Sequence, residues 1–126
     1  MKSVVKLGLA VAWGAAALAP ALAETDTEVA LVPGGPHPYF SAWEQAGKDA
    51  MKDFNLGAGD YRVPQKWELA QQSQLLDSLL TQGYNSFLIF PGDAVGTNSV
   101  VSEIVDNGGQ AIATAGCLMD PTPASC

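Results

Sequence analysis

The sequence predicts an α/β fold in which helices flank a parallel β-sheet. Two observations support this fold class. Short apolar runs alternate along the chain with longer segments whose apolar residues recur every three or four positions. Such strand–helix alternation is typical of parallel sheets with right-handed crossover connections. With 126 residues, 48% of them hydrophobic and 15% charged, the chain can form one globular domain.

The first 23 residues have the pattern of a secretory signal peptide. Lys2 and Lys6 are followed by an apolar run over residues 7–19 and by Pro20-Ala21-Leu22-Ala23, an Ala-x-Ala cleavage site. The apolar run is short for a membrane span. A retained membrane anchor is the alternative, but Pro20 and the small residues beside it favour cleavage. We therefore expect export to the periplasm and a mature domain of residues 24–126 that does not insert into the membrane.

The charge of the expected mature chain disfavours negatively charged partners. Residue 24 is Glu and not Cys, which argues against a lipid-modified N-terminus. Removal of the two N-terminal lysines leaves four basic and thirteen acidic residues, a net charge near −9. Nucleic acid and anionic membrane surfaces are therefore unfavourable partners. A DNA-binding repressor is also excluded, because no N-terminal helix-turn-helix pattern is present.

The first half of the domain contains two predicted strands around one helix. Residues 28–32, EVALV, predict a short buried strand. Residues 40–54 have apolar side chains at helical spacing and charged residues on the other face, which predicts an amphipathic helix. Asn55-Leu56-Gly57 is expected to end it, with Gly57 as the C-cap. Residues 61–63 predict a second, weaker strand before Pro64.

The second half repeats the alternation more clearly. Residues 67–82 predict a leucine-rich helix closed by Gly83. Residues 86–90, SFLIF, form a continuous apolar run, which predicts a strand buried on both faces. A third helix is expected over residues 95–106, and residues 110–114, QAIAT, predict the fourth strand.

The loops after the strands are the expected binding region. In an open parallel sheet, ligands bind beyond the carboxyl ends of the strands. The first of these loops contains Gly34-Gly35, but the motifs that bind phosphate are absent, and Pro36 and Pro38 remove two backbone N–H groups that such a loop would need. A phosphate site is therefore excluded.

Binding and catalysis both remain open for the polar and aromatic residues of these loops. Tyr39 and Phe40, held by rigid prolines, offer flat faces that suit the C–H surface of a sugar ring, and we expect Tyr39 to be the exposed one. His37, Lys66 and Asp93 could hydrogen-bond to hydroxyl groups. The alternative is an exported hydrolase-like enzyme with His37 as base and Asp93 as partner. Because no nucleophile motif accompanies them, binding is favoured.

Two long stretches resemble a known family. Residues 29–54, VALVPGGPHPYFSAWEQAGKDAMKDF, and residues 75–114, LLDSLLTQGYNSFLIFPGDAVGTNSVVSEIVDNGGQAIAT, are similar to the sugar-type periplasmic binding proteins of ABC importers, the ribose- and galactose-binding-like type I family. His37-Pro38-Tyr39-Phe40 corresponds to the family's first-loop motif, and Pro91-Gly92-Asp93 to its Pro-x-Asp loop. The likeness covers nearly all of residues 28–114.

The resemblance implies a Rossmann-like lobe of a two-lobed binding protein. The ligand would be a sugar or related polyol, the partner would be a membrane permease, and neither enzymatic activity nor a cofactor would be involved. His37, Tyr39, Phe40 and Asp93 would contact the ligand. A polar residue often precedes the family's proline where Phe90 stands here, and an Asp-Arg pair is replaced by Ala115-Gly116. A sensory or chemotactic binding protein of the same fold is the alternative.

Chain length and cysteines give the last expectations. Members of that family are roughly twice as long, so we expect this sequence to represent the N-terminal lobe without the second.

Cys117 and Cys126 can form a local disulfide in an exported protein, which would stabilise the fold by ~2–3 kcal/mol. Pairing with another chain, or two free thiols, are the alternatives. Two cysteines and one remote histidine match no metal-ligand spacing.

Overall fold

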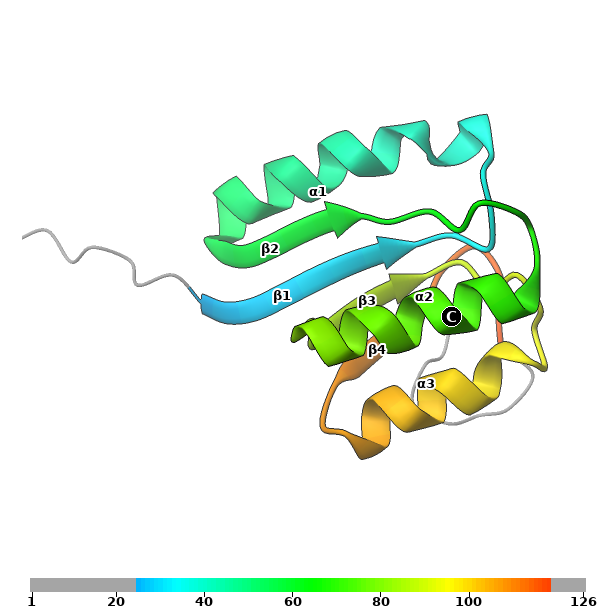
Figure 1. The fold of residues 1–126 in the computed structure, drawn as a ribbon. Coiled ribbons are helices and arrows are strands. Elements are labelled where there is room, and N and C mark those ends of the chain that lie inside the picture. The colour runs from blue at the N-terminus through cyan, green and yellow to red at the C-terminus, as the bar shows by residue number, and fades with distance from the viewer. Residues whose placement is uncertain (1–24, 119–126) are drawn as a thin grey trace, which may run out of the picture.

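The structure, a computed structural model, describes residues 25–118. The expected signal peptide and Cys126 lie outside the described residues. The described elements follow the order β1 (Thr25–Val32), a 3₁₀ turn η1 (Pro38–Phe40), α1 (Ser41–Phe54), β2 (Leu56–Tyr61), α2 (Leu69–Gln82), β3 (Ser86–Ile89), α3 (Thr97–Asp106) and β4 (Gln110–Ala113). Figure 1 shows the strands in one sheet, with the helices packed beside it.

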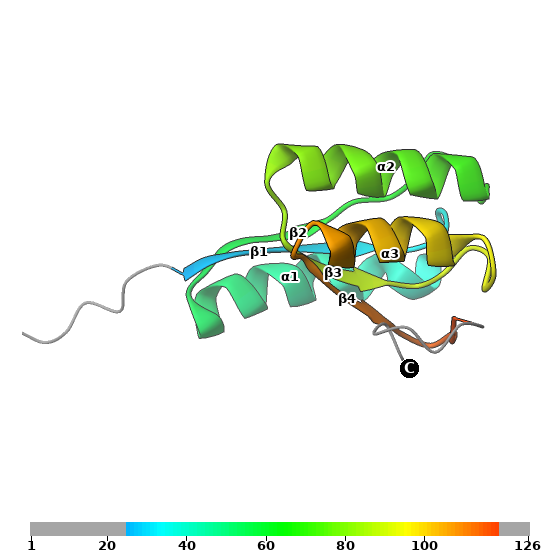
Figure 2. The same ribbon diagram turned by 90° about the horizontal axis from the view of Figure 1, so that it is seen from below.

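The four strands form a parallel sheet of order β2-β1-β3-β4. Helices α2 and α3 cover one face, and α1 covers the other face over β1 and β2 (Figure 2). The predicted α/β class with a parallel sheet and flanking helices is confirmed. All strands point the same way, so the loops that follow them lie together at one edge of the sheet (Figure 1).

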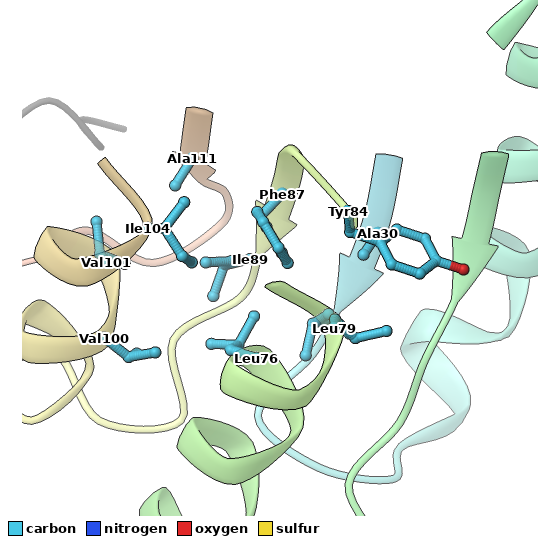
Figure 3. Packing of buried hydrophobic residues seen from close by; sticks show 11 residues of the cluster. Ala30, Leu76, Leu79, Tyr84, Phe87, Ile89, Val100, Val101, Ile104 and Ala111 are labelled. Carbon is cyan, nitrogen blue, oxygen red and sulfur yellow. The ribbon is translucent and has the colours of Figure 1, made fainter. Parts of the chain in front are cut away.

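The hydrophobic core lies between the sheet and the pair α2 and α3. Figure 3 shows Leu76 and Leu79 of α2 facing Phe87 and Ile89 of β3, with Ile104 of α3 beside them. These side chains are almost fully buried. The leucine-rich pattern of the second predicted helix therefore marks the face that contacts the sheet.

The third strand is fully buried on one face only. Phe87 and Ile89 point into the core, whereas Ser86 and Leu88 on the opposite face are half-buried. On that face, Ile112 of the neighbouring β4 is 59% exposed. Burial on both faces, expected from the continuous apolar run, is therefore wrong for this strand, because α1 covers β1 and β2 and not β3 and β4.

The second strand lies earlier than the sequence indicated. It covers Leu56–Tyr61 and not residues 61–63, and Asn55, in the left-handed conformation with φ of 53°, ends α1 in place of Gly57. The strand contains two glycines, which have no side chains, so its sequence does not show the alternation of apolar and polar residues that is typical of a strand. Gly59 is required because a Cβ there would lie 2.4 Å from the carbonyl oxygen of Gly47 in α1. The helix and the strand thus touch backbone to backbone.

A polar cluster joins the end of β2 to the loop before β3. The Tyr84 hydroxyl donates a hydrogen bond to the Asp60 carboxylate, and Arg62 Nη2 lies 2.9 Å from Asp60 Oδ2. The hydrogen bond from Tyr84, and to a lesser degree the Arg62 guanidinium, hold the pKa of Asp60 below its usual 3.8. The ionised form of Asp60 is therefore favoured in the folded state.

This cluster predicts an acid-sensitive contribution to stability. A carboxyl group whose pKa is lower in the folded than in the unfolded state stabilises the fold above its unfolded pKa. That stabilisation is lost as the pH falls below about 4 and through the folded pKa. We expect Asp60→Asn to weaken the fall in unfolding free energy between pH 5 and pH 3, measured by urea denaturation at each pH. Asp77→Asn, at an exposed position of α2, is the control, and an unchanged pH profile for Asp60→Asn would contradict the assignment.

Candidate functional site

The loop after β1 packs against two other loops at the sheet edge. A Cβ on Gly34 would lie 2.5 Å from the Cα of Gly92, and a Cβ on Gly35 would lie 2.7 Å from the Cα of Trp67. Neither position has room for a side chain. The Gly-Gly pair is therefore explained by close approach of the loops after β1, β2 and β3.

His37 organises the start of the first helical turn. Its Nδ1 accepts a hydrogen bond from the backbone N–H of Tyr39 at 3.1 Å, so His37 is the N-cap of η1. A nitrogen that accepts cannot carry the proton in the neutral ring, which places the proton on Nε2. His37 is exposed, and its Nε2–H group can therefore donate to a ligand.

Phe40 is the centre of an aromatic cluster. It is 2% exposed, whereas Tyr39 is 65% exposed, as expected from the sequence. The ring centroid of Phe40 lies 4.9 Å from that of Trp43, 5.1 Å from that of Phe90 and 6.3 Å from that of Trp67. Packing of this kind fixes the rings before any ligand arrives.

A cavity of about 360 Å³ opens beside this cluster. Its walls come from the loops after β1, β2, β3 and β4, at the carboxyl edge of the sheet. Ala115 has a φ of 55°, a left-handed conformation that a residue with a side chain rarely adopts. The lining residues are His37, Tyr39, Phe40, Trp67, Phe90 and Ala115.

A buried glutamine of α2 makes hydrogen bonds to the loop that carries Phe90. Gln72 of α2 is fully buried. Its Nε2 donates to the carbonyl oxygen of Phe90 at 2.8 Å, and its Oε1 accepts from the backbone N–H of Gly92 at 2.9 Å. Gln72 therefore sets the path of the chain at the point where Phe90 enters the cavity wall.

Two residues of the predicted site lie outside the cavity lining. Asp93 Oδ1 accepts hydrogen bonds from the backbone N–H groups of Gly96 at 2.6 Å and Val95 at 3.0 Å, and these bonds lower the pKa of Asp93. The Nζ of Lys66 lies 3.9 Å from Oε1 of Glu68 at the surface. Ligand contacts of these two residues stay predictions.

The structure thus brings together only part of the predicted set. His37, Tyr39 and Phe40 share the cavity, whereas Asp93 does not line it and its Oδ1 is bonded to the backbone of Val95 and Gly96. The loop that ends at Trp67 was expected at the binding edge, but Trp67 was not named as a ligand contact, because it was expected to begin a helix, whereas α2 begins at Leu69. The Gly34-Gly35 pair could have indicated the position of Trp67, because adjacent glycines in a loop allow another loop to pack closely against it.

The described residues contain neither a group of three side chains that could hold a metal ion nor a helix long and apolar enough to span a bilayer. The expected pairing of Cys117 with Cys126 stays a prediction, because Cys126 lies outside the described residues.

Solved structures share this fold at low sequence identity. They include an ABC transporter solute-binding protein from Burkholderia graminis in complex with D-arabinose, with a TM-score of 0.65, 20% identity, and 71% of this chain and 31% of that chain covered. A sugar transporter from Clostridium phytofermentans has a TM-score of 0.66 and 16% identity over 75% of this chain and 36% of that chain. A periplasmic ribose ABC transporter from Conexibacter woesei has a TM-score of 0.65 and 17% identity over 78% and 33%. No protein-family model and no curated protein matches the sequence.

These neighbours confirm the fold that the resemblance implied. The described residues form a parallel α/β lobe like a lobe of the sugar-binding periplasmic proteins. The chain spans about a third of the length of these solved structures.

Proposed function

We propose that residues 24–126 form the N-terminal lobe of a periplasmic solute-binding protein that captures a sugar or related cyclic polyol for an ABC-type importer. The observation that carries this proposal is the aromatic cavity at the carboxyl edge of the sheet, where this fold binds ligands. The neighbours add support, since they are transport proteins described as binding D-arabinose and D-allose.

In this mechanism the lobe provides one wall of the binding site. A ring presents its C–H face to Trp67 and Phe90, which the buried Phe40 supports, and its edge hydroxyls meet the Nε2–H of His37 and the hydroxyl of Tyr39. A second lobe covers the opposite face and supplies the remaining hydrogen bonds. Closure of two lobes around the ligand presents it to a membrane permease. No bond in the ligand is broken, so the protein acts without enzymatic chemistry.

Titration of the purified protein with both lobes present tests this function with monosaccharides. The panel includes D-arabinose, D-allose and D-glucose, and binding is measured by calorimetry. For the sugar that binds, we expect Trp67→Leu to weaken affinity at least ~10-fold, about 1.4 kcal/mol, because the exposed ring of Trp67 forms part of the cavity wall.

Trp43→Leu is the matched control, since Trp43 contacts Phe40 from behind and does not line the cavity. Circular dichroism of both variants checks that they fold. Equal loss of affinity in the two variants would place the ligand elsewhere, and the absence of binding across the panel would overturn the sugar assignment.

A further inference from the structure

The wall that this lobe contributes to the cavity is poor in hydrogen-bonding side chains. None of its six lining residues has a carboxylate, amide or guanidinium group. The side-chain polar atoms that line it belong to His37, Tyr39 and Trp67. His37 Nδ1 is already bonded to the backbone of Tyr39, so His37 offers one donor and no acceptor.

The two charged residues predicted for the site, Asp93 and Lys66, do not add hydrogen-bonding groups to this wall. One oxygen of the Asp93 carboxylate already accepts two backbone hydrogen bonds, and the Lys66 ammonium lies near Glu68. Neither residue lines the cavity. On this lobe, a sugar hydroxyl therefore finds a side-chain partner at His37 and Tyr39, and one that faces Phe40 or Phe90 finds none.

The walls suit an aromatic ring instead. The rings of Phe40 and Trp67 lie 27° from parallel, and Phe90 meets both at a steep angle, with its centroid 5.8 Å from that of Trp67. An aryl group can stack on one ring and contact the edge of another, and it requires no hydrogen bond. The cavity volume of about 360 Å³ is at the lower end of the range for small-molecule sites, roughly 300–1,000 Å³.

We propose that the ligand carries an aryl ring that lies against Trp67 and Phe90, whose rings pack on the buried Phe40. Resting on the proposed function, the polar part of the ligand is a sugar, so the ligand is an aryl glycoside. Its sugar directs hydroxyl groups toward His37 and Tyr39 at the exposed rim. A free aromatic compound has the same aryl chemistry and is the other source that the experiment must distinguish.

Matched glycosides test the proposal on the purified protein with both lobes present. Phenyl and methyl β-D-glucopyranoside, the corresponding β-D-galactopyranosides and phenol are titrated by calorimetry. We expect one phenyl glycoside to bind at least ~10-fold more tightly than its methyl counterpart and more tightly than phenol. Equal affinity of the methyl and phenyl glycosides would overturn this inference and leave the sugar-binding function intact.

The remaining outcomes separate the inference from the function. Binding of phenol with no added affinity from the sugar would support the aryl site and overturn the sugar function. If neither the glycosides nor phenol bind, the aryl inference falls, and the monosaccharide panel decides the sugar function separately.

Substitution of the cavity wall gives an independent test. Phe90→Asn removes an aromatic wall and adds an amide, so the preference for phenyl over methyl glycoside is expected to fall at least ~5-fold. Phe54→Asn is the matched control, because Phe54 is 71% exposed on α1 and does not line the cavity. Trp67→Leu should lower the same preference if Phe90→Asn fails to fold. An unchanged preference in a folded wall variant would overturn the proposal.

Discussion

Replacing Gly47 with alanine is expected to lower the free energy of unfolding by about 1–3 kcal/mol, the usual cost of overpacking a well-packed interior. In an exposed helix the same change stabilises by roughly 0.5–1 kcal/mol, because alanine loses less backbone entropy on folding. At Gly47 the added Cβ would lie 2.3 Å from the carbonyl oxygen of Gly59. A backbone atom of a strand cannot move aside. The cost of the steric clash is therefore larger than the stabilisation that alanine gives a helix. Urea denaturation followed by circular dichroism measures the difference.

Ala46→Gly supplies the control for this prediction. Ala46 is the preceding residue of α1 and is exposed, so its substitution measures the effect of helix propensity alone. We expect a loss of about 0.5–1 kcal/mol. If Gly47→Ala instead stabilises the protein by that amount, then α1 and β2 do not touch as closely as described.

Gln72→Leu is expected to lower the free energy of unfolding by about 2–4 kcal/mol. Leucine has a similar size, but it leaves the carbonyl of Phe90 and the N–H of Gly92 without their partner, at about 1–2 kcal/mol for each of these part-buried groups. Because the loop then loses its support, the Phe90 ring is also expected to leave the cavity wall, and ligand affinity should fall with stability. Urea denaturation and calorimetry measure the two effects.

Gln74→Leu separates the role of Gln72 from helix composition. Gln74 is exposed on α2, and its replacement should change the free energy of unfolding by less than about 0.5 kcal/mol. Wild-type ligand affinity in a folded but destabilised Gln72→Leu variant would show that the glutamine supports the fold and not the site.

Most of the fold could be predicted from local patterns, and the exception has a physical cause. Apolar runs and helical spacing located three strands and three helices, because their core-facing side chains are large. The strand β2 was misplaced because Gly57 and Gly59 have no side chains to show an alternation. Gly59 is present for its contact with α1, a tertiary demand that local sequence does not reveal.

The site was less predictable than the fold. His37, Tyr39 and Phe40 are adjacent in sequence, and their loop could be placed at the sheet edge from topology alone. Trp67 and Phe90 join them only after three loops meet over two glycines. Ala115 lies in the loop after a further strand, β4. Pairwise contacts between distant loops leave no periodic signal, so sequence patterns could indicate the edge but not the composition of the wall.

The position of β1 also determines when the chain can fold. It is the first strand, yet it lies inside the sheet and pairs with both β2 and β3, which do not pair with each other. Its contacts link Thr25 to Asn55, 30 residues away, and Glu28 to Asn85, 57 residues away. Such distant pairings close slowly, because loop entropy is lost before the contacts form. A growing chain therefore cannot complete the pairings of β1 until Ile89, the last residue of β3, has been synthesised.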